Sequence, residues 1–150
     1  MAVGTANPAY GDNPNEMGSN LPWMDLLNEP LFQIATGDLK SCARMPGASL
    51  GIYQLKCWGF GWGGALGQGN NESLGNSLNT VGSFVPAINL GTGRYAIQVA
   101  IGGGHVCAVL DDATVKCWGS NAMGQLGQGD IQPRGDGNLP MGDGLSALDL

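Results

Sequence analysis

Few residues of this 150-residue chain have the chemistry for catalysis or metal binding. His105 is the single histidine, and no serine or cysteine nucleophile with an orienting acid forms a recognisable motif. We therefore expect His105 to be a structural residue at the end of a strand, and we predict no catalytic residue. Asp130, Asp136 and Asp143 lie in glycine-rich loops but lack the pattern and closing glutamate of a calcium loop. Solvated turns are their expected role, so no metal site and no cofactor is predicted.

The cysteines are the other residues with reactive side chains, and there are four: Cys42, Cys57, Cys107 and Cys117. None belongs to a Cys-x-x-Cys motif, so the pattern does not favour a zinc site. Two disulfides and a set of free buried thiols both fit the number of cysteines.

Two short motifs have functional meanings in other contexts. Arg134-Gly135-Asp136 spells an adhesion tripeptide, but such triplets arise by chance, and integrin-type binding is not expected. Asn71-Glu72-Ser73 is an N-glycosylation sequon, which matters only if the chain is secreted.

Charge and hydropathy exclude several kinds of partner. The net charge is −6, and the six lysines and arginines are scattered along the chain. Nucleic acids and anionic membrane surfaces require clustered cations, so neither is an expected partner. The sequence holds no apolar run of about 18 residues that would span a membrane. Residues 1–8 lack a charged region followed by an apolar one, so we do not expect a signal or transit peptide there.

An internal repeat organises the chain, which contains 27 glycines. Cys57-Trp58-Gly59 recurs as Cys117-Trp118-Gly119, and Gln33-Ile34-Ala35-Thr36-Gly37 is similar to Gln98-Val99-Ala100-Ile101-Gly102. A third element of ten residues occurs three times, at 17–26, 81–90 and 141–150. The predicted units are an N-terminal segment with the tail of a preceding repeat at 1–30, a degenerate repeat at 31–93 and a second repeat at 94–150.

Each repeat has the pattern of short strands bounded by turns. In the second repeat the expected strands are 96–101, 106–110 and 115–118, with a fourth near 147–150. Repeats of about 60 residues with several short strands are typical of propeller blades. The predicted fold is therefore all-β: two propeller-type blades of short antiparallel strands, a partial β-propeller with glycine-rich loops.

Hairpin geometry favours one pairing of the cysteines. Cys107 and Cys117 are equidistant from Asp112, so a loop centred on Asp112 makes them directly opposed across two antiparallel strands. Opposed Cα atoms at a non-hydrogen-bonded site lie about 4.5 Å apart, which is within disulfide range. Cys42 and Cys57 would be opposed across a longer loop. The favoured pairing is Cys42–Cys57 and Cys107–Cys117, and unpaired thiols that merely pack are the alternative.

The four tryptophans fall into two pairs. Trp58 and Trp118 occupy equivalent repeat positions after a strand, which predicts a structural role in blade packing. Trp23 and Trp62 do not follow the repeat pattern. Both are candidate interface anchors, because an exposed aromatic side chain is a frequent centre of protein binding; a local core role is the alternative.

Three segments of the second repeat carry a distinctive pattern, in order: Gly102–Leu110, Val115–Asn121 and Gly124–Asp130. They hold a glycine-histidine strand, a Trp-Gly-x-Asn turn and a Gly-Gln-Leu-Gly-x-Gly-Asp segment. With these motifs the chain resembles the regulator-of-chromosome-condensation repeat family, well over residues 31–150 and partly over residues 11–26. The ten-residue element at 17–26, 81–90 and 141–150, which we call the linker motif, begins as Met-Gly-x-x-Leu-Pro in its first copy. It is similar to linkers found in algae, dinoflagellates especially, and cysteines paired in this register resemble those of extracytoplasmic members.

The resemblance implies blades of four antiparallel strands around an axis, and the sequence departs from it at three places. Leu39 stands one position from where the first repeat's histidine is expected. Residues 60–65 replace the Ser-Asn-x-x-Gly-Gln turn, and Ala113 replaces the usual turn glycine. Family functions include nucleotide exchange on a small GTPase, ubiquitin ligation, ultraviolet reception and β-lactamase inhibition, and no residue here carries any one of them over.

The best-supported functional hypothesis is a non-catalytic protein-binding or scaffold module, an accessory subunit of a larger assembly such as an organellar, photosynthetic complex. Two blades would leave sheet faces and edges for a protein partner or another copy to cover. The alternatives are a secreted or cell-surface repeat protein and a fragment of an exchange factor for a small GTPase. Disulfides would favour an extracytoplasmic or organellar-lumen location.

Overall fold

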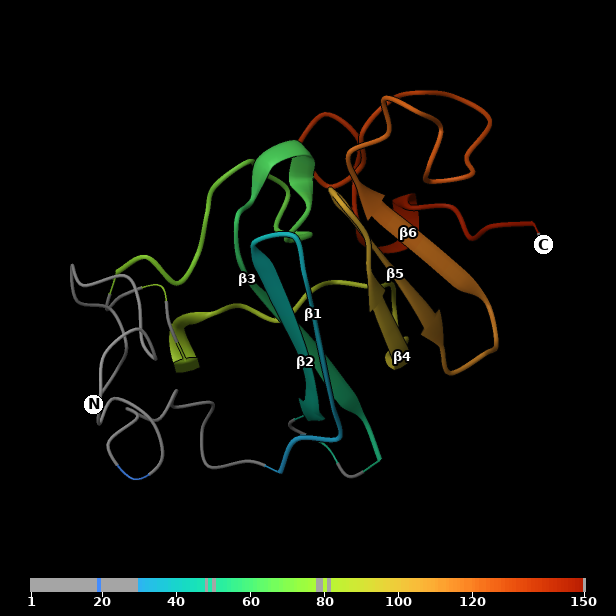
Figure 1. Cartoon of the computed structure of the whole chain (residues 1–150). Helices are drawn as coiled ribbons and strands as arrows, with labels where there is room; N and C mark the ends of the chain where they lie inside the picture. The colour runs from blue at the N-terminus through green and yellow to red at the C-terminus, as the bar shows by residue number, and fades with distance from the viewer. Residues whose placement is uncertain are drawn as a thin grey trace.

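The computed structural model describes residue 19 and residues 30–47, 49, 51–77, 80 and 82–149. Trp23, one of the two candidate interface anchors, lies outside them. The described residues form two three-stranded antiparallel sheets and no α-helix (Figure 1). The first sheet consists of β1 (Gln33–Gly37), β2 (Lys40–Pro46) and β3 (Tyr53–Gly59). The second consists of β4 (Ala96–Ile101), β5 (His105–Leu110) and β6 (Val115–Gly119).

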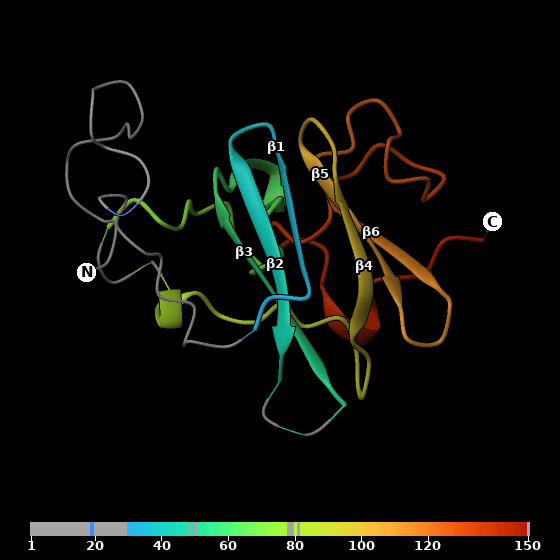
Figure 2. The ribbon, with the colours of Figure 1, turned by 60° about the horizontal axis from the view of Figure 1, so that its bottom comes forward.

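Each sheet is a meander in which consecutive strands are neighbours. The two sheets stand side by side, each tilted with respect to the other like adjacent blades (Figure 2). Short 3-10 helices that lie within the described residues are η2 (Trp62–Gly64), η4 (Gly82–Phe84) and η5 (Gly142–Gly144). The all-β, blade-type architecture expected from the repeat is therefore present. One sheet lies in residues 31–93 and the other in 94–150.

The expected fourth strand of the second blade is absent from the described residues. The N–H of Leu148 donates to the carbonyl of Val115 in β6 at 2.8 Å, and this bond joins the segment to the sheet. The same bond occurs in the first blade, where Ile88 donates to Leu55 of β3 at 2.8 Å. One bond is not a ladder, because antiparallel strands exchange bonds at alternate residues. The segment therefore lies beside the outer strand without extending the sheet.

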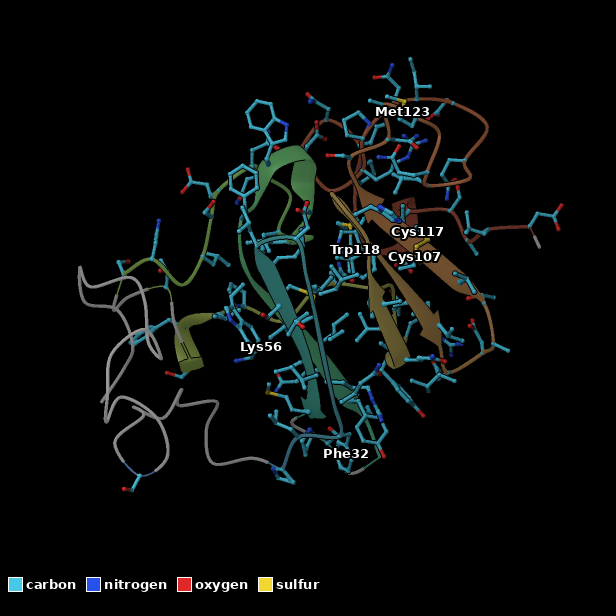
Figure 3. All side chains as sticks on the ribbon, viewed as in Figure 1. Phe32, Lys56, Cys107, Cys117, Trp118 and Met123 are labelled. Carbon is cyan, nitrogen blue, oxygen red and sulfur yellow. A yellow bond between two sulfur atoms is a disulfide. The ribbon has the colours of Figure 1, made fainter. Side chains whose placement is uncertain are left out.

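The core lies between the two sheets. Trp118 is fully buried and points between them (Figure 3), where it packs with Leu55, Val99, Val106 and Leu110 in one cluster. The residues of β5 alternate between half-buried and buried, as expected for a strand with one face toward this core. Burial of large apolar side chains from both blades in one cluster makes the two repeats one folded unit.

A buried lysine attaches the linkers to the second blade. The ammonium of Lys116 donates to the carbonyl of Leu90 at 3.0 Å and to the carbonyl of Gly142 at 2.8 Å. A buried charge is costly unless it is hydrogen-bonded, and these carbonyls supply the bonds. Asp143 in turn accepts hydrogen bonds from the N–H of Thr92 at 2.8 Å and from its hydroxyl at 2.6 Å. The third copy of the linker motif thereby contacts the second copy.

The structure explains two departures from the family pattern. Ala113 has φ of 66°, so an alanine takes the left-handed conformation that a glycine would adopt more easily. Lys40 pairs with Gly59 as His105 pairs with Gly119, so Lys40, and not Leu39, is the first blade's counterpart of His105. Leu39 is the exposed residue of the preceding turn, with φ of 64°. The turn Asp38-Leu39 has the same length as Gly103-Gly104 of the second blade, so Lys40 and His105 stand 65 residues apart, as the first cysteines of the two blades do.

Candidate protein-interaction surface

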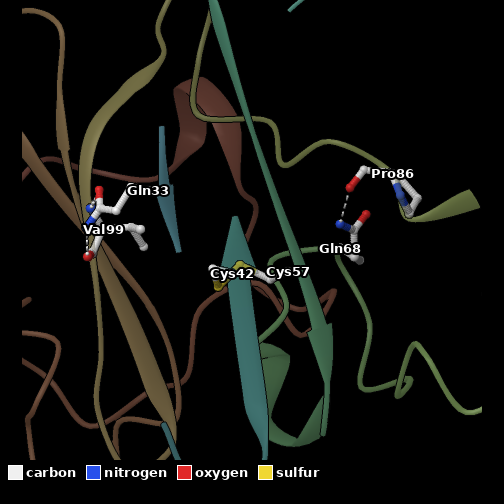
Figure 4. The surroundings of a disulfide bond; sticks show 6 residues. All are labelled: Gln33, Cys42, Cys57, Gln68, Pro86 and Val99. Carbon is white, nitrogen blue, oxygen red and sulfur yellow. Dashed lines mark hydrogen bonds between the residues drawn. A yellow bond between two sulfur atoms is a disulfide. The ribbon is translucent and has the colours of Figure 1, made fainter. Parts of the chain in front are cut away.

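The four cysteines form the two disulfides that the hairpin geometry predicts. Cys42 bonds Cys57 and Cys107 bonds Cys117, each pair directly opposed in the strand register. Figure 4 shows the first bond crossing from β2 to β3. Each pair has a Cα–Cα distance of 4.1 Å, close to that of a non-hydrogen-bonded antiparallel pair. Each disulfide cross-links the central strand of its blade to the outer strand, β2 to β3 in the first blade and β5 to β6 in the second.

The residues assigned structural roles lie within the blades. Trp118 is at the centre of the core, whereas its repeat counterpart Trp58 is half-buried beside Gly75. His105 begins β5, and its backbone carbonyl accepts the N–H of Gly102 at 2.9 Å. Burial lowers the pKa of His105, and the nearby charge of Lys40 lowers it further. The neutral imidazole is thus favoured, and the described residues place no group of three or more metal-ligating side chains together.

Trp62, the other candidate anchor, is exposed on a set of loops at one end of both blades. The side chain is 69% exposed, and it is accompanied by other exposed apolar residues: Leu39, Phe60, Met123 and Ile131. We call these five residues the loop face. Figure 3 places Met123 at the end of the molecule opposite Phe32. Large apolar side chains gathered at one end are typical of binding surfaces.

The loop that carries Trp62 is held in place by glycines. A Cβ at Gly61 would collide with the carbonyl of Glu72, and one at Gly64 would collide with the backbone of Gly135 and Asp136. Gly63 has φ of 68° and lies against the side chain of Ser120. The unusual Phe-Gly-Trp-Gly-Gly sequence is therefore a close-packed contact between the loops of the two blades. It presents the Trp62 indole to solvent from a backbone that has little freedom to move.

In the second blade the corresponding loop is held by a side-chain network. Asn121 is buried; its amide donates to the carbonyls of Asp130 and Gln132, both at 3.0 Å, and its oxygen accepts the N–H of Leu126 at 2.9 Å. Arg134 forms an ion pair with Asp130 at 2.8 Å. That pair, together with the N–H of Gln132, lowers the pKa of Asp130. The loop between Asn121 and Arg134 is thus fixed by interior bonds, while Met123 and Ile131 on it are exposed.

A shallow groove lies between the two loops. Trp62 and Asn71 line it from the first blade, and Ser120, Ile131 and Pro133 line it from the second. Its volume is about 260 Å³, below the range of ligand pockets but enough for a side chain of a partner. Asp136 also lines the groove, so its rim includes a carboxylate.

The two short motifs are built into these loops. Arg134 is engaged with Asp130, and Asp136 accepts hydrogen bonds from the backbone and side chain of Asn138 at 3.0 and 2.8 Å. The Arg-Gly-Asp triplet is therefore part of the loop's own bonding. The side-chain oxygen of Asn71 in the sequon accepts the N–H of Gly64 at 3.0 Å, while the residue remains exposed.

Sequence reasoning missed most of the loop face. It singled out Trp62, but not Phe60, Met123 or Ile131, because a lone apolar residue in a loop carries no periodic signal. The repeat itself held one clue that was not used: Asn121 recurs in the family turn, whereas Gly61 stands at the equivalent position. That substitution marks the place where the first blade's loop closes against its own Glu72, next to the contact that Gly63 and Gly64 make with the second blade.

Comparison with known proteins identifies the repeat. Residues 96–125, from the start of β4 to the loop after β6, match the family described as "Regulator of chromosome condensation (RCC1) repeat". The second blade thus contains an RCC1 repeat. The match covers the second blade, whose glycine-histidine strand and Trp-Gly-x-Asn turn carry the family pattern.

Relatives and structural neighbours agree with this assignment. The ultraviolet-B receptor UVR8 of Arabidopsis thaliana is 37% identical over 79 residues, which are 53% of this chain and 16% of UVR8. Human WBSCR16 has a TM-score of 0.53 at 19% identity over 80% of this chain and 26% of its own. Yeast RCC1 (Prp20), in a complex with Kap60, has a TM-score of 0.51 at 20% identity over 70% and 24%. The chain thus spans about a sixth of UVR8 and a quarter of these propeller proteins, and the RCC1 repeat indicates a protein-interaction or regulatory module.

Proposed function

We propose that this chain is a non-catalytic protein-binding module, and that its partner binds the loop face. The observation that carries the proposal is the exposure of Trp62 on a backbone fixed by packed glycines. Binding orders the side chains of an interface, and that ordering costs free energy. A tryptophan whose loop is already fixed loses less on binding, so it is well suited to be an anchor.

Ile131 lines the groove with Trp62, and the other exposed residues of the loop face add to the apolar area at this end of the molecule. Met123 is 89% exposed and Phe60 and Ile131 are exposed as well, and the four residues come from loops of both blades. An interface that draws on both blades requires the two sheets to be packed together, as the shared core ensures. The binding activity would therefore depend on the folded two-blade unit and not on one repeat.

The charges around the groove indicate the chemistry of the partner. Asp136 lines the groove, and Asp130 lies on the same loop as Ile131. The chain as a whole has a net charge of −6. We infer that the partner presents an apolar side chain to the groove, flanked by lysine or arginine, because such an arrangement complements both the apolar floor and the acidic rim.

The disulfides favour an oxidising compartment as the place of this interaction. Disulfides persist in oxidising environments and are rare in the cytosol. Two bonds, each between the central and the outer strand of a blade, favour an extracytoplasmic or organellar-lumen assembly in which the chain is an accessory subunit.

Site-specific photo-crosslinking tests the proposal. The photoreactive residue benzoylphenylalanine is placed at Trp62 in the chain expressed in its own host, with Ile52 as the matched control. Ile52 is an exposed apolar residue beside Phe32, at the end of the molecule away from the loop face. We expect a protein adduct from position 62 that is weaker or absent from position 52, and that is lost when Phe60→Ser is added. Equal adducts from both positions, or none from position 62, would overturn the proposal.

A further inference from the structure

The two blades are joined by a side-chain amide that binds a strand edge. The Nε2 of Gln33 in β1 donates to the carbonyl of Val99 at 2.9 Å, and the N–H of Val99 donates to Oε1 of Gln33 at 3.1 Å (Figure 4). Gln33 therefore satisfies both backbone groups of Val99 on the edge of β4 that faces away from β5.

The rest of the joint follows from strand alternation. In β1 the side chains of Gln33, Ala35 and Gly37 share one face, because alternate residues of a strand point the same way. Ala35 packs against the core, and a Cβ at Gly37 would lie 3.2 Å from the Cγ2 of Ile101. The Gln-x-Ala-x-Gly face of the first blade is thus covered by Val99 and Ile101 of the second.

The second blade presents the same face to solvent. Gln98, Ala100 and Gly102 repeat the pattern 65 residues later, and Gln98 and Ala100 are exposed. Because Val99 and Ile101 point toward the first blade, these residues point away from it. The second blade therefore displays an uncovered copy of the surface that the first blade uses to bind a neighbour.

The first blade presents the complementary surface. Ile34 and Thr36 are the counterparts of Val99 and Ile101, and both are exposed, Ile34 to 57%. Thr36 is β-branched like Ile101, so it can place a methyl group against a glycine in the same way.

The backbone of Ile34 is also available at this edge. The Cys42–Cys57 pair is a non-hydrogen-bonded site between β2 and β3, so Cys42 directs its backbone groups to Ala35 of β1. Bonded and non-bonded pairs alternate along the ladder, so the adjacent pair, Ile34 with Ala43, is non-bonded. The N–H and C=O of Ile34 therefore point away from β2, as those of Val99 point to Gln33.

We propose that the Gln98–Ala100 face of one copy of this chain binds the Ile34–Thr36 edge of a second copy, head to tail. In this contact the Gln98 amide donates to the C=O of Ile34 and accepts from its N–H, as Gln33 does with Val99. The occupant is a second copy because the chain already forms this joint once, between surfaces with the same side chains in the same register. The contact is heterologous, so each added copy exposes a fresh face and edge.

One element of the joint differs. The ring of His105 lies against Gly102, where a methyl group of Ile101 lies against Gly37 in the internal joint. The proposed contact is therefore centred on Gln98 and Ala100. The loop face takes no part in it, so either proposal stands if the other fails.

Sedimentation equilibrium of the full 150-residue chain over micromolar to millimolar concentrations tests the proposal. Ala100→Arg blocks the face, and Ile34→Arg blocks the edge; both residues are exposed, so circular dichroism should show an unchanged fold. We expect the wild type to associate with rising concentration and each variant to remain monomeric. An equimolar mixture of the two variants should form a 1:1 dimer, because each keeps the surface that the other has lost. Gln98→Ala should raise the dissociation constant about tenfold, through the loss of two hydrogen bonds.

Three outcomes would overturn the proposal. A wild type that stays monomeric at the highest concentration shows that the faces do not bind. Association that survives both arginine variants, or a mixture of variants that does not pair, shows that another surface is used. Association abolished by Trp62→Ser alone assigns self-binding to the loop face instead.

Discussion

Gln33 pairs with both backbone groups of Val99, so a single side chain joins the inner strands of two blades. A propeller must hold neighbouring sheets together although no backbone ladder runs between them. Here a side-chain amide uses one of its N–H donors and its acceptor oxygen, and it binds the neighbour's edge as the backbone of a strand would.

Replacement of Gln33 measures the strength of this joint. Gln33→Ala should lower the free energy of unfolding by about 1–2 kcal/mol, because two hydrogen bonds are lost and the edge of Val99 is left without its partner. Urea denaturation followed by circular dichroism gives the value. Gln98→Ala is the matched control at the equivalent exposed position, and in dilute solution it should change stability little. Equal losses from the two variants would contradict the assigned role.

A glycine beside the core tryptophan tests the packing between blades. Gly67 and Gly69 both have positive φ, 67° and 73°, but a Cβ at Gly67 would lie 2.9 Å from Nε1 of Trp118, whereas one at Gly69 meets nothing within 4 Å. Gly69→Ala should cost about 1 kcal/mol from backbone strain alone. Gly67→Ala should cost about 1–3 kcal/mol more, because the core must shift to accept the methyl group. Thermal denaturation measures the loss of stability in each variant. An equal loss in Gly67→Ala and Gly69→Ala would contradict this packing.

Each disulfide should stabilise its blade to a similar degree. The Cys42–Cys57 and Cys107–Cys117 bonds close loops with sequence separations of 15 and 10 residues. Loop entropy predicts about 3 kcal/mol from each bond, so each pair replaced by two alanines should lower unfolding stability by that amount. Thiol titration of the native wild type should find no free thiol before reduction, and a finding of four would contradict the pairing.

Ala113 offers a stabilising substitution. Its φ of 66° is left-handed, which costs an alanine about 1 kcal/mol relative to a residue without a Cβ. Ala113→Gly should therefore raise the free energy of unfolding by up to about 1 kcal/mol. Ala122, an exposed alanine without positive φ, is the control, and Ala122→Gly should be neutral or destabilising.

The single histidine should report on its buried surroundings. Burial and then the charge of Lys40 lower the pKa of His105 below its ordinary value of 6.5. The unfolded chain binds this proton more readily, so His105 should make the protein less stable as pH falls below 6.5. An NMR titration of the imidazole gives the pKa directly. Lys40→Met should raise it toward 6.5, and Lys56→Met, which replaces the other buried lysine of the first sheet, should not.

Local spacing determined much of the fold in advance. The 60-residue recurrence of Cys-Trp-Gly and Leu-Gly-Gln-Gly placed two equivalent units, and the equal distances of Cys107 and Cys117 from Asp112 set the hairpin register and the disulfide. These features are readable because a repeat copies its local geometry, and the period-2 pattern of a strand depends only on near neighbours. The packing role of Trp118 was predicted in the same way, from its equivalent repeat position to Trp58.

Only the tertiary structure decided what surrounds each repeat. Phe60-Gly61-Trp62-Gly63-Gly64 looked degenerate, but Gly63 and Gly64 are required where the second blade approaches, and Gly61 is required where Glu72 of its own blade approaches. The Gln33–Val99 joint spans 66 residues, and the groove beside Trp62 is lined from both repeats. Such contacts depend on the angle and distance at which two blades pack, which no local pattern records. The sequence by itself therefore determined the blades, and their packing decided which copy of each residue is buried and which is left to bind.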